Sequence, residues 1–282
     1  LSLYGRFDFI LAKDGTPKIL EFNADTPTSL LEASVIQWQW KEDVFPECDQ
    51  FNGIHEGLVQ SWKDIFPKKG EIHFAGALEN NEDTGTLQYL ASTAMEAGFS
   101  TRVLDMQALD LQNGRFFDPA GELVNRCFKL YPWEWMVDES PDGCLAEMEW
   151  LEPIWKLVMS NKAILATLYE LFPDSPYVLP CYLSRPRSGL FCKKPVFSRE
   201  GHNVSVVDIR DWEEYVRIAE TEGDYNTGAY VYQEYAEPTA YSGRYPVIGS
   251  WIIGGEAAGI GIRENRMEVT DNLSEFVPHI IG

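Results

Sequence analysis

The sequence contains no apolar run approaching the roughly 18 residues that a membrane-spanning helix needs, and it is poor in metal-binding sulfur and imidazole groups. Its four histidines lie far apart, and none of its five cysteines forms a Cys-x-x-Cys pair, so no zinc site is predicted. An odd number of scattered cysteines is typical of reduced thiols, which predicts a cytoplasmic protein. We read all five cysteines as packing residues.

Basic residues are also scarce. The 282 residues include 23 Lys and Arg against 44 Asp and Glu, which gives a net charge of −21. This balance excludes a general nucleic-acid or anionic-membrane binder, because both need a basic surface. It still permits an anionic small molecule held in a local basic pocket. The sequence begins at Leu1, inside a strand-like segment, so we expect an upstream segment to be missing from this numbering.

A hairpin is predicted over residues 6–25, because Asp14-Gly15 is a strong turn signal between two apolar segments. With this turn, Asp8 faces Glu21 and Arg6 faces Asn23. All four side chains share one face, since strand side chains alternate. The phenylalanines and leucine on the opposite face are expected to form core.

Two carboxylates directly opposite each other repel, so this face needs compensation. Arg6 supplies part of it, and a hard cation such as Mg²⁺, which prefers carboxylate and amide oxygens, would supply more. A solvated hairpin face with tolerated charges explains the same spacing. The spacing alone leaves both interpretations open.

Two helices are expected next, over residues 26–43, with Thr26 or Thr28 as the cap, and over residues 50–66. The segments that follow predict a small Rossmann-like βαβ module: a strand at 71–78, a helix at 83–98 and a strand from 100.

The acidic loop "ENNED" follows the first strand of this module, at the edge where ligands collect in parallel sheets. It could hold a cationic amine through Glu82 and Asp83. A solvated, helix-capping loop is the alternative.

The remaining sequence alternates apolar strands and helices, with a mostly helical stretch at 151–173 and a strand pair at 189–208. Lys129, Lys162 and Lys194 each stand among strongly apolar residues. A buried lysine is costly unless it is paired or meets an anion, although a single one is more often a snorkelling surface residue. Three of them, together with an acidic metal face, suggest a nucleoside triphosphate with Mg²⁺.

Several motifs together resemble a known family. These are "RFDF…LEFNADTPTSL", "FKLYPWEWM", "KKPVFSREGHNV", "YVYQEY" and "GSWIIGGEAAGIGIRE". They are similar in order and spacing to the glutathionylspermidine synthase family of ATP-grasp ligases, above all to its bacterial acid–amine ligases without an amidase domain. The resemblance implies an α+β or α/β protein, with an ATP-grasp fold in permuted order and an inserted Rossmann-like βαβ module. It divides the chain into ATP-grasp parts at 1–70 and 128–282 and a substrate-side module at 71–127.

The resemblance also implies roles for individual residues. The expected Mg²⁺ ligands are Asp8, Glu21 and Asn23. The expected ATP contacts are Lys129, Lys162, Lys194, Gly201, Gln233, Glu234 and Tyr235. Arg263 corresponds to a basic residue at the reacting phosphate. The acid substrate is expected at Arg6 and Thr26, and the amine at Glu82 and Asp83.

The sequence therefore predicts an ATP- and Mg²⁺-dependent carboxylate–amine ligase that forms an amide through an acyl phosphate. Its partners would be small molecules, a glutathione-like carboxylate and a polyamine-like amine, and not nucleic acid or membrane. Two alternatives remain open: a phosphotransferase acting on a small molecule, and a non-catalytic nucleotide-binding protein.

Overall fold

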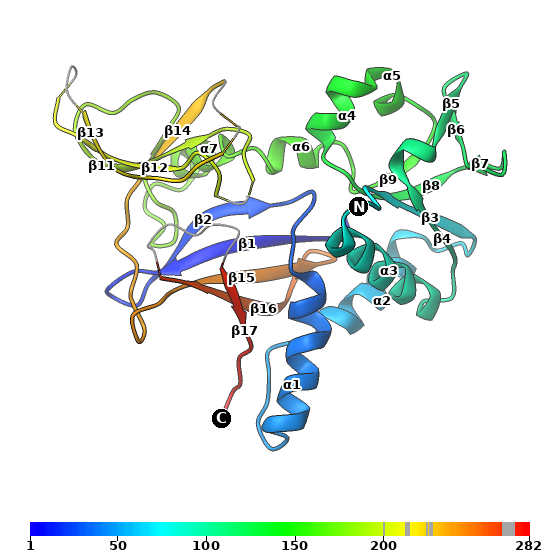
Figure 1. Ribbon diagram of the computed structural model, residues 1–282, viewed down its shortest axis with the longest axis horizontal. Coiled ribbons are helices and arrows are strands. Elements are labelled where there is room, and N and C mark those ends of the chain that lie inside the picture. Colours follow the sequence, from blue (N-terminus) through cyan, green and yellow to red (C-terminus); the bar gives the residue numbers. More distant parts are fainter. Residues whose placement is uncertain (200, 212–214, 224, 226–227, 267–273) are drawn as a thin grey trace.

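The computed structural model describes residues 1–199, 201–211, 215–223, 225, 228–266 and 274–282. Over these residues the protein is a mixed α/β structure whose strands form four sheets. Figure 1 shows two antiparallel sheets on one side of the molecule and a parallel sheet with its helices on the other. Within the described residues, no helix is both long and apolar enough to cross a membrane.

The central sheet carries the hairpin. Its five strands are antiparallel and run in the order β17 (Glu275–Val277), β16 (Glu256–Asn265), β15 (Tyr245–Ile253), β1 (Tyr4–Leu11) and β2 (Pro17–Asn23). The predicted register is confirmed, because Asp8 pairs with Glu21 and Arg6 with Asn23. A bulge after Asp8 shifts the pairs nearer the turn by one residue.

The expected burial of the hairpin faces is wrong. The polar face is the more deeply buried one, with Arg6 and Asp8 only 4% and 3% exposed. Phe7 and Phe9 on the other face are only partly buried, and Phe7 stacks on Phe22 with 4.1 Å between ring centroids. Alternation predicts which residues share a face, but which face is buried depends on what packs against it.

The second antiparallel sheet has the order β10 (Cys181–Tyr182), β14 (Tyr230–Glu234), β11 (Gly189–Pro195), β12 (Ser205–Ile209) and β13 (Tyr215–Glu220). The pairing of β11 with β12 confirms the predicted strand pair. This sheet lies over β2 (Figure 1), and the Gln233 amide donates to the Ile19 carbonyl at 2.8 Å across the junction. The edge strand of the central sheet is therefore covered.

The third sheet is parallel, in the order β4 (Ser100–Asp105), β3 (Glu71–Gly76), β8 (Arg126–Leu130) and β9 (Glu149–Leu151). Helix α3 (Asn81–Glu96) connects β3 to β4, so the βαβ unit is present as predicted. The sheet continues past residue 127 through β8 and β9. The three-part division of the chain stays a prediction. A small meander, β5 (Asp110–Gln112), β6 (Arg115–Phe117) and β7 (Leu123–Val124), follows β4.

The predicted helix at 26–43 begins only at residue 30. It consists of a π-helical turn, η1 (Glu32–Ile36), and α1 (Gln37–Val44), and no side chain caps η1. Residues 24–29 belong to neither helix nor strand, and Ser29 has a φ of 63°.

The helix predicted at 151–173 is also divided. It forms two helices, α6 (Lys156–Met159) and α7 (Ile164–Leu171), and Lys162 lies in the break between them.

The remaining helices are α2 (Ile54–Ile65), where a helix was predicted, η2 (Met106–Ala108), α4 (Trp133–Glu139) and α5 (Pro141–Cys144). The main core lies where α2 and α3 pack between the central and parallel sheets (Figure 1). Its largest fully buried apolar side chains include Tyr4, Trp62, Phe74, Phe128 and Trp251. This core holds β1 and β15 against the parallel sheet.

Candidate active site

A cavity of about 640 Å³ is lined by residues of the two antiparallel sheets, the segment after β2 and the start of α3. It collects most of the predicted site residues. Those in its lining are Arg6, Asp8, Glu21, Asn23, Thr26, Glu82, Lys162, Lys194, Gly201, Gln233, Glu234, Tyr235 and Arg263. Two predicted residues, Lys129 and Asp83, are not in the lining.

The predicted metal ligands lie together on the hairpin face. Asn23 Nδ2 is 3.3 Å from Asp8 Oδ2 and 3.2 Å from Glu21 Oε1, so both carboxylates approach one point. Two carboxylates and an amide are a donor set that suits Mg²⁺. Among the described residues no group of three His, Cys, Asp or Glu side chains could hold a metal ion, and Asn23 turns its amide nitrogen toward the two carboxylates.

Asp8 is held between two guanidinium groups. Arg6 donates from Nε to Oδ1 at 2.6 Å and from Nη2 to Oδ2 at 2.9 Å, and Arg263 donates to Oδ2 at 2.6 Å. Burial acts to lower the pKa of Arg6, but Asp8 outweighs it and raises this pKa above its usual value. The charge of Arg6, followed by burial, lowers the pKa of Arg263. Arginine pairing thus offsets the carboxylate repulsion within the protein itself.

Glu21 lies near Lys162 and Lys194, two lysines predicted to contact the nucleotide. Lys162 Nζ lies 3.0 Å from Glu21 Oε2 and donates to the Ser198 carbonyl at 2.6 Å. Burial acts to raise the pKa of Glu21, but Lys162 and then Lys194 overcome it and hold this pKa at about 2. Burial lowers the pKa of Lys194, and the nearby charge of Lys162 adds to the effect. An anion bound between the two ammonium groups would relieve this repulsion.

The cavity continues along one face of the paired strands β11 and β14. Lys194 donates to Gln233 Oε1 at 2.7 Å and to the Leu20 carbonyl at 3.1 Å, which fixes its ammonium at the edge of β2. Apolar side chains line this part, including Ile10, Leu179, Val204 and Val247. Lys193 is not in the lining, and its ammonium lies 3.9 Å from the centre of the Tyr230 ring. Alternation along β11 therefore separates the two adjacent lysines as expected.

Lys129 and Asp83 lie apart from the other predicted site residues. Lys129 is fully buried and ion-paired with Asp25 at 2.7 Å, which gives it no contact with the cavity. Glu82 lines the cavity, whereas Asp83 does not. The loop does cap α3, through Asn80 and not through either acidic residue: the Asn80 side chain accepts a hydrogen bond from the backbone N–H of Glu82 at 2.9 Å.

Two residues of the site were missed. Arg199, between β11 and β12, donates to Thr26 Oγ1 at 2.5 Å and forms an ion pair with Glu134. Gly249 on β15 pairs with Asp8, and a Cβ there would lie 2.7 Å from Arg6 Cδ, so the glycine makes room for the buried arginine. A glycine inside a strand is the sequence signal for such a close approach.

The chain belongs to the glutathionylspermidine synthase preATP-grasp family, whose sequence pattern matches residues 1–282. It is 39% identical to the "Putative acid--amine ligase" of Haemophilus influenzae, over 98% of this chain and 74% of that protein. It is 28% identical to the "Trypanothione synthetase" of Crithidia fasciculata and 26% identical to the "Bifunctional glutathionylspermidine synthetase/amidase" of Escherichia coli. These two alignments cover 96% and 98% of this chain but only 46% and 49% of the relatives.

Two solved structures share the fold. A "Putative gamma-glutamylcysteine synthetase" from Methylobacillus flagellatus superposes with a TM-score of 0.68 at 10% identity, over 99% of this chain and 80% of that one. A glutathione synthetase-like effector from Globodera pallida gives a TM-score of 0.60 at 11% identity, over 99% and 76%. At such low identity the likeness concerns the fold alone.

Proposed function

We propose that this protein is an ATP- and Mg²⁺-dependent carboxylate–amine ligase with an ATP-grasp fold in permuted order. The central observation is that the oxygen ligands of the hairpin and the buried lysines of the nucleotide side meet in one cavity, with Glu21 and Lys162 3.0 Å apart. The family and its acid–amine ligase relative support the same reaction class. In this proposal the βαβ unit is the inserted Rossmann-like module on the substrate side.

In this reaction the γ-phosphoryl group of ATP passes to a substrate carboxylate oxygen, which releases ADP and leaves an acyl phosphate. An amine nitrogen then attacks the acyl carbon, phosphate departs, the nitrogen loses a proton and an amide results. No side-chain nucleophile is needed. The protein contributes position and positive charge, the main factors in phosphoryl transfer.

The nucleotide is assigned to the space between the two antiparallel sheets. Lys162 and Lys194 neutralise its phosphates, and the apolar lining beside Gln233, Glu234 and Tyr235 accommodates the adenine. Asp8, Glu21 and Asn23 would hold Mg²⁺, which neutralises phosphate charge when bound. The cavity volume is sufficient for a nucleotide together with a small substrate.

The acid substrate is assigned to the end of the cavity at Arg6, Thr26 and Arg263. The two guanidinium groups approach the same carboxylate, Asp8, from different directions. A transferring phosphoryl group carries charge on several oxygens, and paired guanidiniums suit it well. Glu82, at the start of α3, is the residue of the acidic pair that can meet a cationic amine inside the cavity.

The proposal is tested by a screen of carboxylate–amine pairs for ADP release, with mass spectrometry of the product. Reduced glutathione with spermidine is the first pair, because the name of the Escherichia coli relative points to glutathionylspermidine. An amide product with ADP supports the ligase. A stable phosphorylated acid without an amide would identify a phosphotransferase instead, and no Mg²⁺-dependent turnover of ATP with any pair would contradict both.

A further inference from the structure

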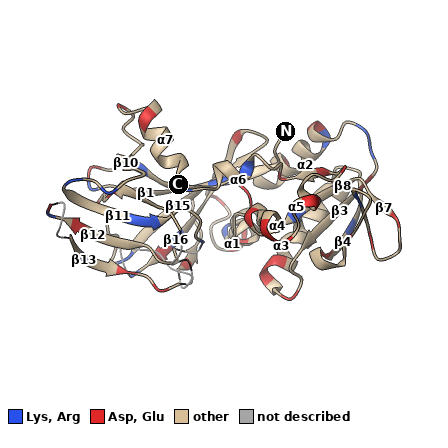
Figure 2. Ribbon diagram, turned by 90° about the horizontal axis from the view of Figure 1, so that it is seen from above, with Lys and Arg blue, Asp and Glu red and all other residues tan. Residues whose placement is uncertain are grey.

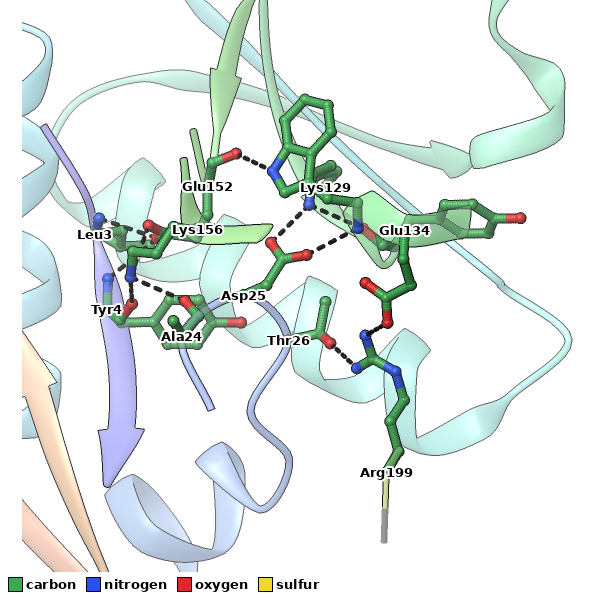
Figure 3. Close-up of polar contacts among 12 residues, drawn as sticks. Leu3, Tyr4, Ala24, Asp25, Thr26, Lys129, Glu134, Glu152, Lys156 and Arg199 are labelled. Atoms are coloured by element: carbon green, nitrogen blue, oxygen red, sulfur yellow. Dashed lines mark hydrogen bonds and ion pairs between the residues drawn. The ribbon is translucent and has the colours of Figure 1, made fainter. Parts of the chain in front are cut away.

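A second group of charged side chains is buried beside the cavity and is not part of its lining (Figure 3). The Asp25 carboxylate accepts from Lys129 Nζ at 2.7 Å and from the backbone N–H of Trp133 at 2.9 Å. Lys129 also donates to the Tyr131 carbonyl at 2.9 Å. The side chains of Lys129 and Asp25 are 0% and 1% exposed, so each ion is enclosed and paired.

A second buried pair holds the same segment from the other side. Lys156 Nζ donates to the carbonyls of Ala24 and Tyr4 at 2.8 and 2.6 Å, and it lies 3.3 Å from Glu152. Glu152 in turn accepts from the backbone N–H groups of Leu3 and Tyr4 at 2.9 and 3.1 Å. The backbone of residue 24 and the side chain of residue 25 are therefore both anchored to the parallel-sheet side of the molecule (Figure 3).

This anchoring matters because residues 24–29 belong to neither helix nor strand. No ladder of backbone hydrogen bonds fixes their course, so side-chain contacts must do so. Asn23 precedes the anchor and Thr26 follows it, and both line the cavity. A displacement of Asp25 would therefore move a metal ligand and an acid-site hydroxyl together.

The start of α4 also contributes contacts to the segment that contains Asp25 and Thr26. Trp133 bonds Asp25 through its backbone, and the next residue, Glu134, forms the ion pair with Arg199. Arg199 donates to the Thr26 hydroxyl (Figure 3). The first turn of α4 thus contacts the acid-site segment directly through Asp25 and indirectly through Arg199.

We propose that Asp25 and Lys129 are positioning residues that fix Asn23 and Thr26 in the active site, and that Lys129 acts through Asp25 instead of contacting the nucleotide. The roles given to Asn23 and Thr26 rest on the proposed function. The placement of the segment by the Asp25–Lys129 pair does not. Removing one partner of a buried ion pair leaves an uncompensated charge, whereas neutralising both is often tolerated.

The test compares Lys129→Met and Asp25→Asn with the double variant. Hydrogen–deuterium exchange is followed in peptides covering residues 20–31, and Mg·ATP affinity is measured by calorimetry. Lys129→Met leaves the Asp25 carboxylate unpaired, so exchange in this segment should rise about tenfold or more, as expected for a loss of one decade in local stability. In the double variant the amide oxygen that replaces the carboxylate can still accept from the backbone N–H of Trp133, and exchange should return to within about threefold of wild type.

Mg·ATP affinity should fall in Lys129→Met only together with the faster exchange, because Asn23 is a proposed metal ligand whereas Lys129 is not in the cavity lining, and it should return to within about threefold of wild type in the double variant. Peptides of β15 and β16 serve as the internal standard for global unfolding, and Asp25→Asn is the milder single change if Lys129→Met does not fold. For the acid–amine pair found in the screen, kcat should fall in Lys129→Met and recover in the double variant.

Two results would overturn the proposal. One is a tenfold loss of Mg·ATP affinity in Lys129→Met with unchanged exchange, which would make Lys129 a nucleotide contact. The other is a double variant that exchanges as fast as Lys129→Met. A wild-type protein that binds no Mg·ATP would contradict the proposed function, while the exchange comparison would still decide the positioning role.

Discussion

At the residue scale, the site is a set of buried charges that neutralise one another in close pairs. Asp8 lies between Arg6 and Arg263, and Glu21 lies beside Lys162. Each pair keeps oppositely charged groups in place without a ligand, at a desolvation cost that the hydrogen bonds offset. The same groups are suited to a nucleotide, because a phosphate can replace a carboxylate as the partner of a lysine.

Lys194 and Lys193 form a matched pair for testing the nucleotide site. Lys194→Met should weaken Mg·ATP binding about tenfold or more, because a charge-assisted contact to phosphate contributes on the order of 1.5–3 kcal/mol. Lys162→Met should weaken Mg·ATP binding to a similar extent. Lys193→Met should leave the affinity within about twofold, since Lys193 lies outside the cavity lining. Isothermal titration calorimetry measures all three, and equal losses in Lys193→Met and Lys194→Met would contradict the site.

Glu21 gives the protein a specific pH dependence. Because its folded pKa of about 2 lies below the ordinary value of 4.5, its ionised form stabilises the folded state. This contribution is complete above the ordinary pKa and is lost as the pH falls toward 2. Glu21→Gln should therefore lower the free energy of unfolding most above about pH 5, by at most about 3 kcal/mol.

Urea unfolding of wild type and Glu21→Gln between pH 2.5 and pH 7 measures the difference, with Glu47→Gln at an exposed position as the control. The difference in the free energy of unfolding between wild type and Glu21→Gln should decrease steadily as the pH falls. A difference that stays constant over this range would show that Glu21 is not held ionised by the lysines.

At the element scale, local patterns predict the hairpin and the βαβ unit, because turn residues and apolar spacing act within one segment. The same patterns misplace the helix start at 26 and miss the break at 160–163. In both places tertiary contacts decide: Lys129 holds Asp25, and the backbone N–H of Lys162 donates to the Val196 carbonyl at 3.0 Å. Such contacts leave no periodic trace in the sequence.

At the start of α3, the residue that caps the helix and the residue that lines the cavity are different: Asn80 is the cap and Glu82 is in the lining. Glu82→Gln should raise KM for the amine and leave KM for ATP unchanged, because only Glu82 of the acidic pair lines the cavity. Asp83→Asn should change neither constant. Asn80→Ala should lower the free energy of unfolding by about 1 kcal/mol through loss of the cap, without a kinetic effect.

Steady-state kinetics with the acid–amine pair found in the screen, together with urea unfolding, distinguish these roles. If Asp83→Asn raised KM for the amine while Glu82→Gln did not, the amine would be bound outside this cavity. The comparison uses three neighbouring positions on one helix end, so general loosening of α3 would affect all of them alike.

At the scale of the whole molecule, the site depends on contacts between distant parts of the chain. Asp8 and Arg263 are 255 positions apart, and Asp25 and Lys129 are 104 apart. Spacing cannot predict such pairs. Resemblance to a family identifies residues with shared roles but not their partners, which explains why thirteen of the fifteen assigned residues line the cavity while Asp25, Arg199 and Gly249 were overlooked.

Charge differs between the chain as a whole and the cavity. Figure 2 shows acidic and basic residues on both sides of the molecule, with basic residues on β11. The whole chain carries a net charge of −21, but the described residues of the cavity lining include equal numbers of acidic and basic side chains: Asp8, Glu21, Glu32, Glu82 and Glu234 against Arg6, Lys162, Lys194, Arg199 and Arg263. An anionic nucleotide therefore meets repulsion at long range and neutralisation only on contact.

This arrangement predicts an unusual salt effect on nucleotide association. Raising the ionic strength from about 0.01 M to about 0.15 M shortens the Debye length from about 30 Å to about 8 Å, which screens the long-range repulsion. The association rate constant of Mg·ATP should therefore rise with salt, while dissociation, governed by contacts inside the cavity, should change less. Stopped-flow measurements with a fluorescent ATP analogue give both constants, and uncharged adenosine is the control that salt should leave unaffected. An association rate that falls with salt would mean that the local cations, and not the net charge of the protein, control the approach of the nucleotide.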